Sequence, residues 1–297
     1  MAKPRDIVIG LIIAGVALAF IVMVVFSLIA ITRHGGMTMI PVGDRIGIVE
    51  VEGPIDSSED IVRQLKKYDE DGSVPAIVLR INSPGGAVAP TQEIFDQIIK
   101  ARANGTYIIA SLSSVAASGG YYIACAADTI IANPGTLTGS IGVIFSFMTF
   151  EGLMDKVGVQ LEVVKTGEMK DVGNYSREMT QREREMLQGA LNDVYNQFVL
   201  AIAQNRNLEV VQVEELADGS IFTGNQALEL GLVDKLGGLE DAISLAGEMT
   251  GLGKNPRIIK EYPRQPSLVD YLLGKAAAYF DLKGPAQAWP KLEYIYK

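Results

Sequence analysis

Ser118 is the residue whose surroundings point most directly to chemistry. It stands in residues 114–122, Ser-Val-Ala-Ala-Ser-Gly-Gly-Tyr-Tyr, where small neighbours leave its hydroxyl uncrowded. A serine hydroxyl becomes a nucleophile when a base takes its proton, and N–H groups at a helix start favour the negative charge that then develops. The same position suits a plain helix-capping serine, so the motif alone leaves both interpretations open.

The base that Ser118 would need is not a histidine. The single histidine, His34, lies at the edge of an apolar span, far from Ser118 in the sequence. Lysine is the remaining common base, but it needs a neutral amine, and roughly one free lysine in a thousand is neutral near pH 7. A partly apolar site, closed by substrate or a neighbouring subunit, could favour that form. Lys156, Lys165 and Lys170 are candidates among which the residues alone do not choose.

Residues 82–86, Asn-Ser-Pro-Gly-Gly, form a second candidate site element. They follow a nearly continuous apolar segment at 76–81 and precede a helical pattern at 91–104. Adjacent glycines let the backbone approach a ligand and direct N–H groups into a cleft. The segment is either an oxyanion hole for a tetrahedral intermediate or an ordinary turn.

Strands and helices alternate through the middle of the chain, which predicts an α/β fold with largely parallel strands. Residues 113–117 are expected to form a turn, 133–142 and 167–180 loops, and Thr180 to Glu183 a capping box. The predicted strands are 46–52, 76–81, 107–112, 129–132 and 161–165, and the predicted helices include 61–68, 91–104, 118–127, 150–157 and 181–204.

Residues 7–31 contain no charged side chain. As a helix they would span about 37 Å, enough for a hydrocarbon core of roughly 30 Å. A cleavable signal peptide has a shorter apolar region, so an uncleaved anchor is expected, with a weak charge preference for a cytoplasmic N-terminus. The chain then divides into a stub and anchor, a linker, a catalytic domain and a tail without assigned role: 1–33, 34–45, 46–251 and 252–297.

Charge and cysteine content exclude several classes of protein. The net charge is −9, and no stretch rich in lysine and arginine follows the apolar span, so nucleic-acid binding is not expected. Cys125 is the single cysteine, which rules out an internal disulfide and a cysteine–histidine zinc site. Its apolar neighbours predict a small buried side chain.

Several motifs occur together in one order: 82–86, 116–122, 137–143 (Leu-Thr-Gly-Ser-Ile-Gly-Val), Lys170-Asp171 and 176–180 (Ser-Arg-Glu-Met-Thr). With the step of 52 residues from Ser118 to Lys170, they closely resemble the signal peptide peptidase A family of membrane-bound serine peptidases, in its short form with one copy of the domain. The resemblance covers about residues 46–251.

The resemblance implies a role for each matching residue. Ser118 matches the nucleophile, Lys170 the general base, and Gly86 the backbone donor of the oxyanion hole. Ser140 matches a hydroxyl that holds the lysine amine in place, and Gly119 is expected as a second oxyanion donor. The family's Clp protease/crotonase-like α/β fold and its ring or dome homo-oligomers are expected as well.

The predicted function is therefore a membrane-anchored endopeptidase with a Ser-Lys dyad and no metal or cofactor. Its catalytic domain is expected outside the cytoplasm, where it would degrade cleaved signal peptides or other apolar peptides. One alternative is a stomatin-associated type of peptidase that cuts one membrane-protein partner. Others are a crotonase-like enzyme acting on acyl thioesters and an inactive scaffold on the membrane.

Overall fold

The computed structural model describes Leu18 and residues 20–23, 43–261 and 293–295. The chain separates into two compact units, residues 1–43 and 44–297. In the first, Leu18 and residues 20–23 are helical and exposed, and the rest of the predicted anchor lies outside the described residues. Among the described residues, no helix combines the length and apolarity needed to cross a bilayer.

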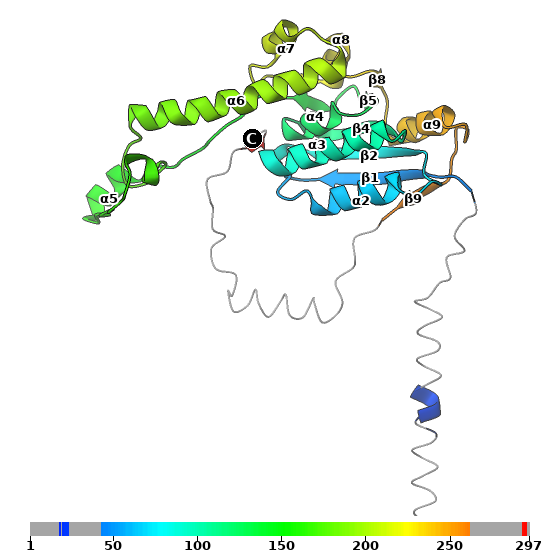
Figure 1. The fold of residues 1–297 in the computed structure, drawn as a ribbon, viewed down its shortest axis with the longest axis horizontal. Helices are drawn as coiled ribbons and strands as arrows, with labels where there is room; N and C mark the ends of the chain where they lie inside the picture. The colour runs from blue at the N-terminus through cyan, green and yellow to red at the C-terminus, as the bar shows by residue number, and fades with distance from the viewer. Residues whose placement is uncertain (1–17, 19, 24–42, 262–292, 296–297) are drawn as a thin grey trace, which may run out of the picture. The chain divides into compact units, whose positions relative to one another are not determined.

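The second unit is built on a mixed sheet whose central strands are parallel (Figure 1). Its order is β7-β6-β4-β2-β1-β9, with β5 paired to β4 and β8, and within it only β6 and β7 pair antiparallel. This confirms the predicted α/β class with a largely parallel sheet. The strands are β1 (Ile46–Glu52), β2 (Ala76–Ser83), β4 (Tyr107–Ala117), β5 (Thr129–Ala132), β6 (Leu137–Gly139), β7 (Ile221–Thr223), β8 (Lys235–Leu236) and β9 (Ile258–Lys260).

Helices cover both faces of this sheet, which is why its central strands are apolar throughout. On one face, α2 (Glu59–Asp69), α3 (Val88–Ala103) and α4 (Gly119–Ala124) enclose the larger core. On the other, α9 (Leu239–Met249) encloses a smaller core with Ile46, Val78 and Ile109. The remaining helical elements are α5 (Glu151–Val157), η1 (Glu168–Asp171), α6 (Gln181–Arg206), α7 (Val210–Leu216) and α8 (Gly224–Glu229).

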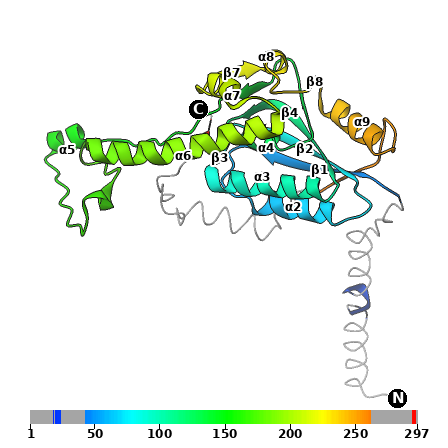
Figure 2. The ribbon, with the colours of Figure 1, turned by 45° about the horizontal axis from the view of Figure 1, so that its top comes forward.

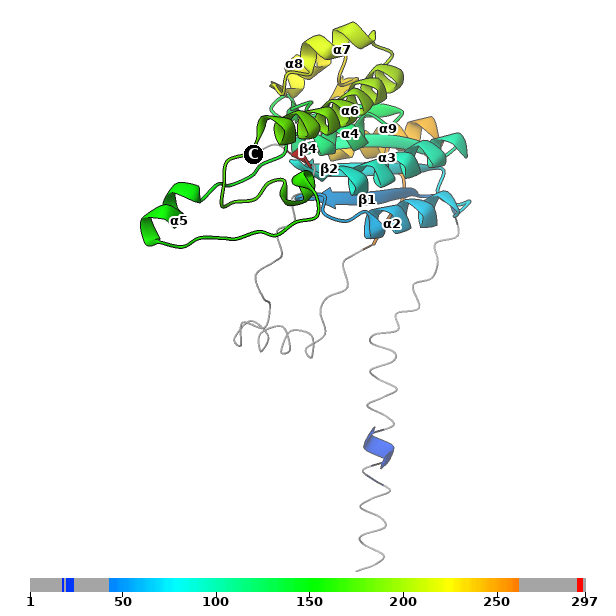
Figure 3. The ribbon, with the colours of Figure 1, turned by 60° about the vertical axis from the view of Figure 1, so that its left-hand side comes forward.

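Helix α6 begins at the predicted capping box, in which Thr180 and Glu183 bond each other's backbone N–H groups. Only its C-terminal half packs into the core, through residues that include Phe198 and Ile202. Its N-terminal half projects beyond the sheet, and α5 lies near that projecting end (Figures 2 and 3). We call residues 144–180, which run along this projection, the arm.

Three local predictions were wrong. Residues 113–117 are the end of strand β4 rather than a turn, because they pair with β2 and β6. The predicted loop 133–142 contains strand β6. Residues 161–165 form no strand, because no described strand lies beside them to pair with, and Val164 is 94% exposed.

A separate pair of strands joins the start of α3 to the end of the chain. Strand β3 (Gly85–Ala87) pairs antiparallel with β10 (Glu293–Ile295), with Gly86 opposite Tyr294. The tail, to which the sequence assigned no role, therefore contributes an extended segment beside the predicted oxyanion hole.

Candidate active site

Ser118 occupies a strained turn between strand β4 and helix α4. Its φ of 52° is positive, a conformation that costs a non-glycine residue about 1–3 kcal/mol and often marks functional sites. The backbone is held by two hydrogen bonds, from its N–H to the Gly139 carbonyl and from the Tyr122 N–H to its own carbonyl, both 2.8 Å. Its side chain makes no capping bond to α4. The hydroxyl is thus not used as a helix cap, which favours the nucleophile interpretation.

Ser140 lies beside Ser118 in the same region. Ala117 and Gly139 are partners in the parallel pairing of β4 and β6, so Ser118 and Ser140 directly follow the ends of two adjacent strands. Ser140 also has a positive φ, 49°, and donates its N–H to the Ser220 carbonyl over 2.7 Å. The structure therefore brings together two serines that lie 22 residues apart in sequence.

The paired glycines of residues 82–86 lie in a tight backbone arrangement. On one side, β3 is hydrogen-bonded to Ile55. The Gly85 carbonyl accepts from the Ile55 N–H, and the Ala87 N–H donates to the Ile55 carbonyl, both over 2.8 Å. Because backbone groups alternate along a strand, those of Gly86 point to the other side, toward Tyr294. A Cβ on Gly86 would lie 2.3 Å from the Ile55 carbonyl oxygen, so this position requires glycine.

The Tyr294 carbonyl lies where β3 and the start of α4 come together. A Cβ on Gly85 would lie 2.0 Å from that oxygen and 2.7 Å from the Gly119 nitrogen. A Cβ on Gly119 would lie 3.1 Å from the same oxygen. A peptide carbonyl thus lies close both to the residue after Ser118 and to the predicted oxyanion segment.

The Tyr294 side chain fills a fully buried aromatic pocket. Its ring stacks on Tyr122 at a centroid distance of 5.1 Å and packs against Phe198 at 4.8 Å, while Phe95 extends the cluster beyond Tyr122. Its hydroxyl donates to the Val194 carbonyl on α6 over 3.2 Å. Sequence reasoning missed this residue because nothing local in the tail predicts where it docks.

Lys170 lies elsewhere, on the exposed arm. Its turn, η1, lies beside the first turn of α6, where Glu168 and Arg182 form an ion pair at 2.6 Å, whereas the Tyr294 pocket meets α6 at Val194. Those two contacts are 12 residues apart, or about 18 Å along the helix. One chain therefore does not bring Lys170 to Ser118, although it does bring together Ser118, Ser140, Gly86 and Gly119.

Two of the candidate lysines in the arm, Lys165 and Lys170, have different contacts. The Lys165 amine forms an ion pair with Asp171 and donates to the Glu168 carbonyl over 2.9 Å. The Lys165 amine is therefore occupied by these two partners. Within the described residues, Lys170 makes no such contact, so its amine is the freer of the two to serve as a base.

The structure also bears on the chemistry of Cys125 and of metal binding. Cys125 is fully buried, as expected, and burial raises the pKa of its thiol to about 12, so it stays protonated and unreactive near pH 7. In the part of the chain that the structure describes, no group of histidine, cysteine and carboxylate side chains could hold a metal ion.

A serine in a strained turn, close to paired glycines and to an extended segment of the same chain, is the arrangement expected of a serine hydrolase that binds extended peptides. The sequence profile of peptidase family S49 matches residues 100–253, and that of the Clp protease family matches residues 43–136.

Individual relatives agree with these profiles. A provisionally named protease of Synechocystis is 45% identical over 210 residues, covering 70% of this chain and 75% of its own. A protein of Enterococcus faecium, provisionally named signal peptide peptidase SppA, is 40% identical over 62% of this chain and 54% of its own. Protease 4 of Haemophilus influenzae is 35% identical over 70% and 35% of the two chains. The chain thus spans about a third to three quarters of these relatives.

The chain belongs to peptidase family S49. It is a serine peptidase, a hydrolase of peptide bonds.

Proposed function

We propose that the protein is a membrane-anchored endopeptidase of the Clp protease/crotonase-like fold, which uses Ser118 and Lys170 to degrade cleaved signal peptides or other apolar peptides. The observation that carries the proposal is the seating of β10. An extended segment of chain pairs with β3 and places a carbonyl beside Gly85 and Gly119. A substrate bound in the same way would present its scissile carbonyl to Ser118.

The chemistry follows from this placement. Ser118 Oγ attacks the carbonyl carbon while the neutral Lys170 amine takes the hydroxyl proton. The Gly86 and Gly119 N–H groups stabilise the oxyanion, and Ser140 holds the amine in place. When the peptide C–N bond breaks, Lys170 returns the proton to the leaving amine. Water, deprotonated by the same amine, then hydrolyses the acyl-enzyme and regenerates the Ser118 hydroxyl.

The preference for apolar peptides is supported by the pocket that Tyr294 fills. Tyr122 and Phe198 form its walls, with Phe95 behind Tyr122, and none of the three carries a charge. A large apolar side chain of a substrate would be favoured there by burial, whereas a charged one would lose its hydration. Signal peptides are rich in such apolar side chains.

The distance between Ser118 and Lys170 within one chain is the reason to propose that a second copy completes the site. The arm exposes many large apolar side chains, which in a soluble monomer would be an unusual concentration. A second copy that covered the arm would bury them and could receive Lys170 next to its own Ser118. The exposed residues are Ile144, Met148, Phe150, Leu153, Val157, Val159, Leu161, Val163, Val164 and Tyr175.

Complementation between inactive variants tests this proposal. Full-length Ser118→Ala and Lys170→Ala chains, purified separately in detergent, should each fail to cleave an apolar signal-peptide substrate. Mixed and allowed to exchange subunits, they should recover activity, because one chain supplies the serine and the other the lysine. Lys156→Ala is the matched control on the arm and should keep full activity. An active Lys170→Ala protein would overturn the dyad.

The membrane part of the proposal rests on residues 7–31, which lie mostly outside the described residues. In cells, a full-length chain should remain with the membrane after carbonate extraction and expose residues 46–251 to protease added from outside the cytoplasm. Release of the intact chain by carbonate would contradict the anchor, and would leave the peptidase chemistry untouched.

A further inference from the structure

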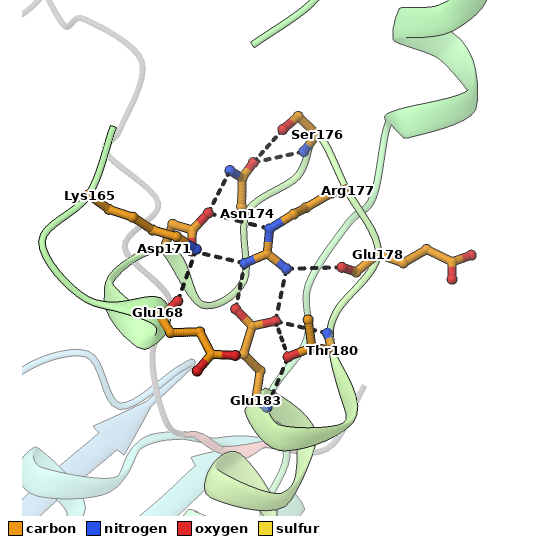
Figure 4. A network of polar contacts seen from close by, with 9 residues as sticks. All are labelled: Lys165, Glu168, Asp171, Asn174, Ser176, Arg177, Glu178, Thr180 and Glu183. Carbon is orange, nitrogen blue, oxygen red and sulfur yellow. Dashed lines mark hydrogen bonds and ion pairs between the residues drawn. The ribbon is translucent and has the colours of Figure 1, made fainter. Parts of the chain in front are cut away.

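Arg177 lies at the centre of a charged network in the arm (Figure 4). Its guanidinium donates on one side to both oxygens of Asp171, at 2.9 and 3.3 Å, and on the other to both oxygens of Glu183, at 2.5 and 2.9 Å. It also donates to the Glu178 carbonyl over 3.0 Å. A planar guanidinium can bind two carboxylates in this paired manner, which a lysine amine cannot.

The Asp171 end of the network fixes the turn that carries Lys170. Asp171 is the last residue of η1 and directly follows Lys170. Its carboxylate accepts hydrogen bonds from Arg177, Lys165 and Asn174, so that both oxygens are used. The hydrogen bonds from Arg177 and Lys165 hold the pKa of Asp171 well below its usual range, so it stays charged and bound to these partners.

The Glu183 end fixes the same network to α6. The side chain of Glu183 is 1% exposed, and it accepts hydrogen bonds from the N–H and hydroxyl of Thr180 at 2.8 and 2.9 Å. The Arg177 guanidinium and these capping bonds lower the pKa of Glu183 to about 2. Because the other half of α6 is buried in the core, a turn tied to Glu183 is held at a defined place relative to the sheet.

We infer that Arg177 is a positioning residue for the general base: by joining Asp171 to Glu183, it fixes η1 on the first turn of α6 and so aims Lys170 at the site it serves. This inference rests on the proposed role of Lys170. Without Arg177, η1 would lose its partly buried link to Glu183, and the carboxylates of Asp171 and Glu183 would face each other.

Arg182 provides a matched control within the same contact region. It too joins η1 to the first turn of α6, through its ion pair with Glu168, but the two side chains are 72% and 59% exposed. Exposed pairs of this kind contribute little. The two arginines therefore allow comparison of a partly buried, paired contact with a solvated one at nearly the same place in the fold.

The first experiment compares Arg177→Gln with Arg182→Gln in the full-length enzyme, using an apolar peptide. Arg177→Gln should lower kcat by about 100-fold, the size expected for a catalytic group displaced by about 1 Å. Its KM should change little, because the proposed contacts of the peptide are with β3 and do not involve Arg177. Arg177→Lys should recover only part of kcat, and Arg182→Gln should stay within about twofold of the wild type. Equal kcat in Arg177→Gln and Arg182→Gln would overturn the inference.

The second experiment separates positioning from a general loss of stability. In mixtures of Ser118→Ala and Lys170→Ala chains, Arg177→Gln is added to one chain or to the other. On the Ser118→Ala chain, which supplies Lys170, it should lower the recovered activity by more than tenfold relative to the other placement. Equal losses in both placements would show a purely structural role and overturn the inference. If the unmodified mixture itself were inactive, the proposed shared site would fail instead.

Discussion

The two parts of the proposed site are held in opposite ways. The region that contains Ser118 is buried and is shaped by backbone: paired glycines, two serines with positive φ, and strands that leave little room for a Cβ. The arm that contains Lys170 is exposed and is fixed by ion pairs between side chains. The proposed nucleophile therefore depends on close packing, whereas the proposed base depends on charge and on a second copy.

The largest effect should come from the nucleophile. Ser118→Ala should lower kcat by a factor on the order of 10⁶, as removal of a catalytic serine does elsewhere. Ser114→Ala is the matched control, because it lies on the same strand with an exposed side chain, and its activity should be unchanged. Steady-state peptide cleavage measures both. Comparable losses of kcat in the two variants would mean that activity depends on the integrity of the strand and not on the Ser118 hydroxyl.

Gly86→Ala tests whether the predicted oxyanion segment depends on close backbone packing. The added Cβ would meet the Ile55 carbonyl oxygen at 2.3 Å, so β3 must shift and the oxyanion donor with it. We expect kcat to fall about 10²- to 10³-fold, the range for loss of one oxyanion donor.

Gly189→Ala on α6 is the matched control for that substitution, because nothing lies within 4 Å of its added Cβ. It should keep full activity and be more stable by about 1 kcal/mol, since alanine favours helix. Normal kcat in Gly86→Ala would remove the oxyanion role from this segment.

Tyr294→Ala tests whether β10 occupies the position beside β3 that a substrate would take. Without its buried ring, β10 should leave β3 more often, and the KM for a short apolar peptide should fall several-fold. Thermal unfolding should also show a loss of stability, because a fully buried aromatic side chain is removed. An unchanged KM, with the same loss of stability, would show that the tail is a structural strand only.

The smallest effect concerns the pH dependence of the arm. The pKa of Glu183 is lowered from 4.5 to about 2, so its contribution to stability is complete above about pH 4.5 and is lost as the pH falls toward 2. Glu183→Gln should weaken that dependence, and urea unfolding at several pH values in this interval measures it. The same slope in both proteins would show that the Arg177–Glu183 pair does not contribute to folding.

The sequence predicted those parts of the fold that local patterns determine. The apolar run at 76–81 and the capping box at Thr180 correspond to β2 and the start of α6. Residues 113–117 and 161–165 were assigned wrongly because strand formation depends on distant partners: the first segment has β2 and β6 beside it, and the second has no described partner.

The site was predictable to the extent that its residues follow paired strands. Ser118 and Ser140 follow β4 and β6, and the glycines of 85–86 follow β2. These three strands pair side by side at their ends, and the motifs that contain the residues stand out in the sequence. The separation of Lys170 from Ser118 depends on the length and direction of α6, which no motif encodes. Arg177 lay in a quoted motif without a role, because its partners become clear only when the arm is folded.

The activity of mixed assemblies, measured against composition, tests the shared dyad most directly. Ser118→Ala and Lys170→Ala chains are combined at ratios from one pure variant to the other. For random exchange in a head-to-tail ring, each site needs one chain of each kind in a fixed order, so activity should rise to about one quarter of the wild type at equal amounts and vanish at both ends. Absence of activity at every ratio, with exchange verified, would contradict a site completed by a second copy.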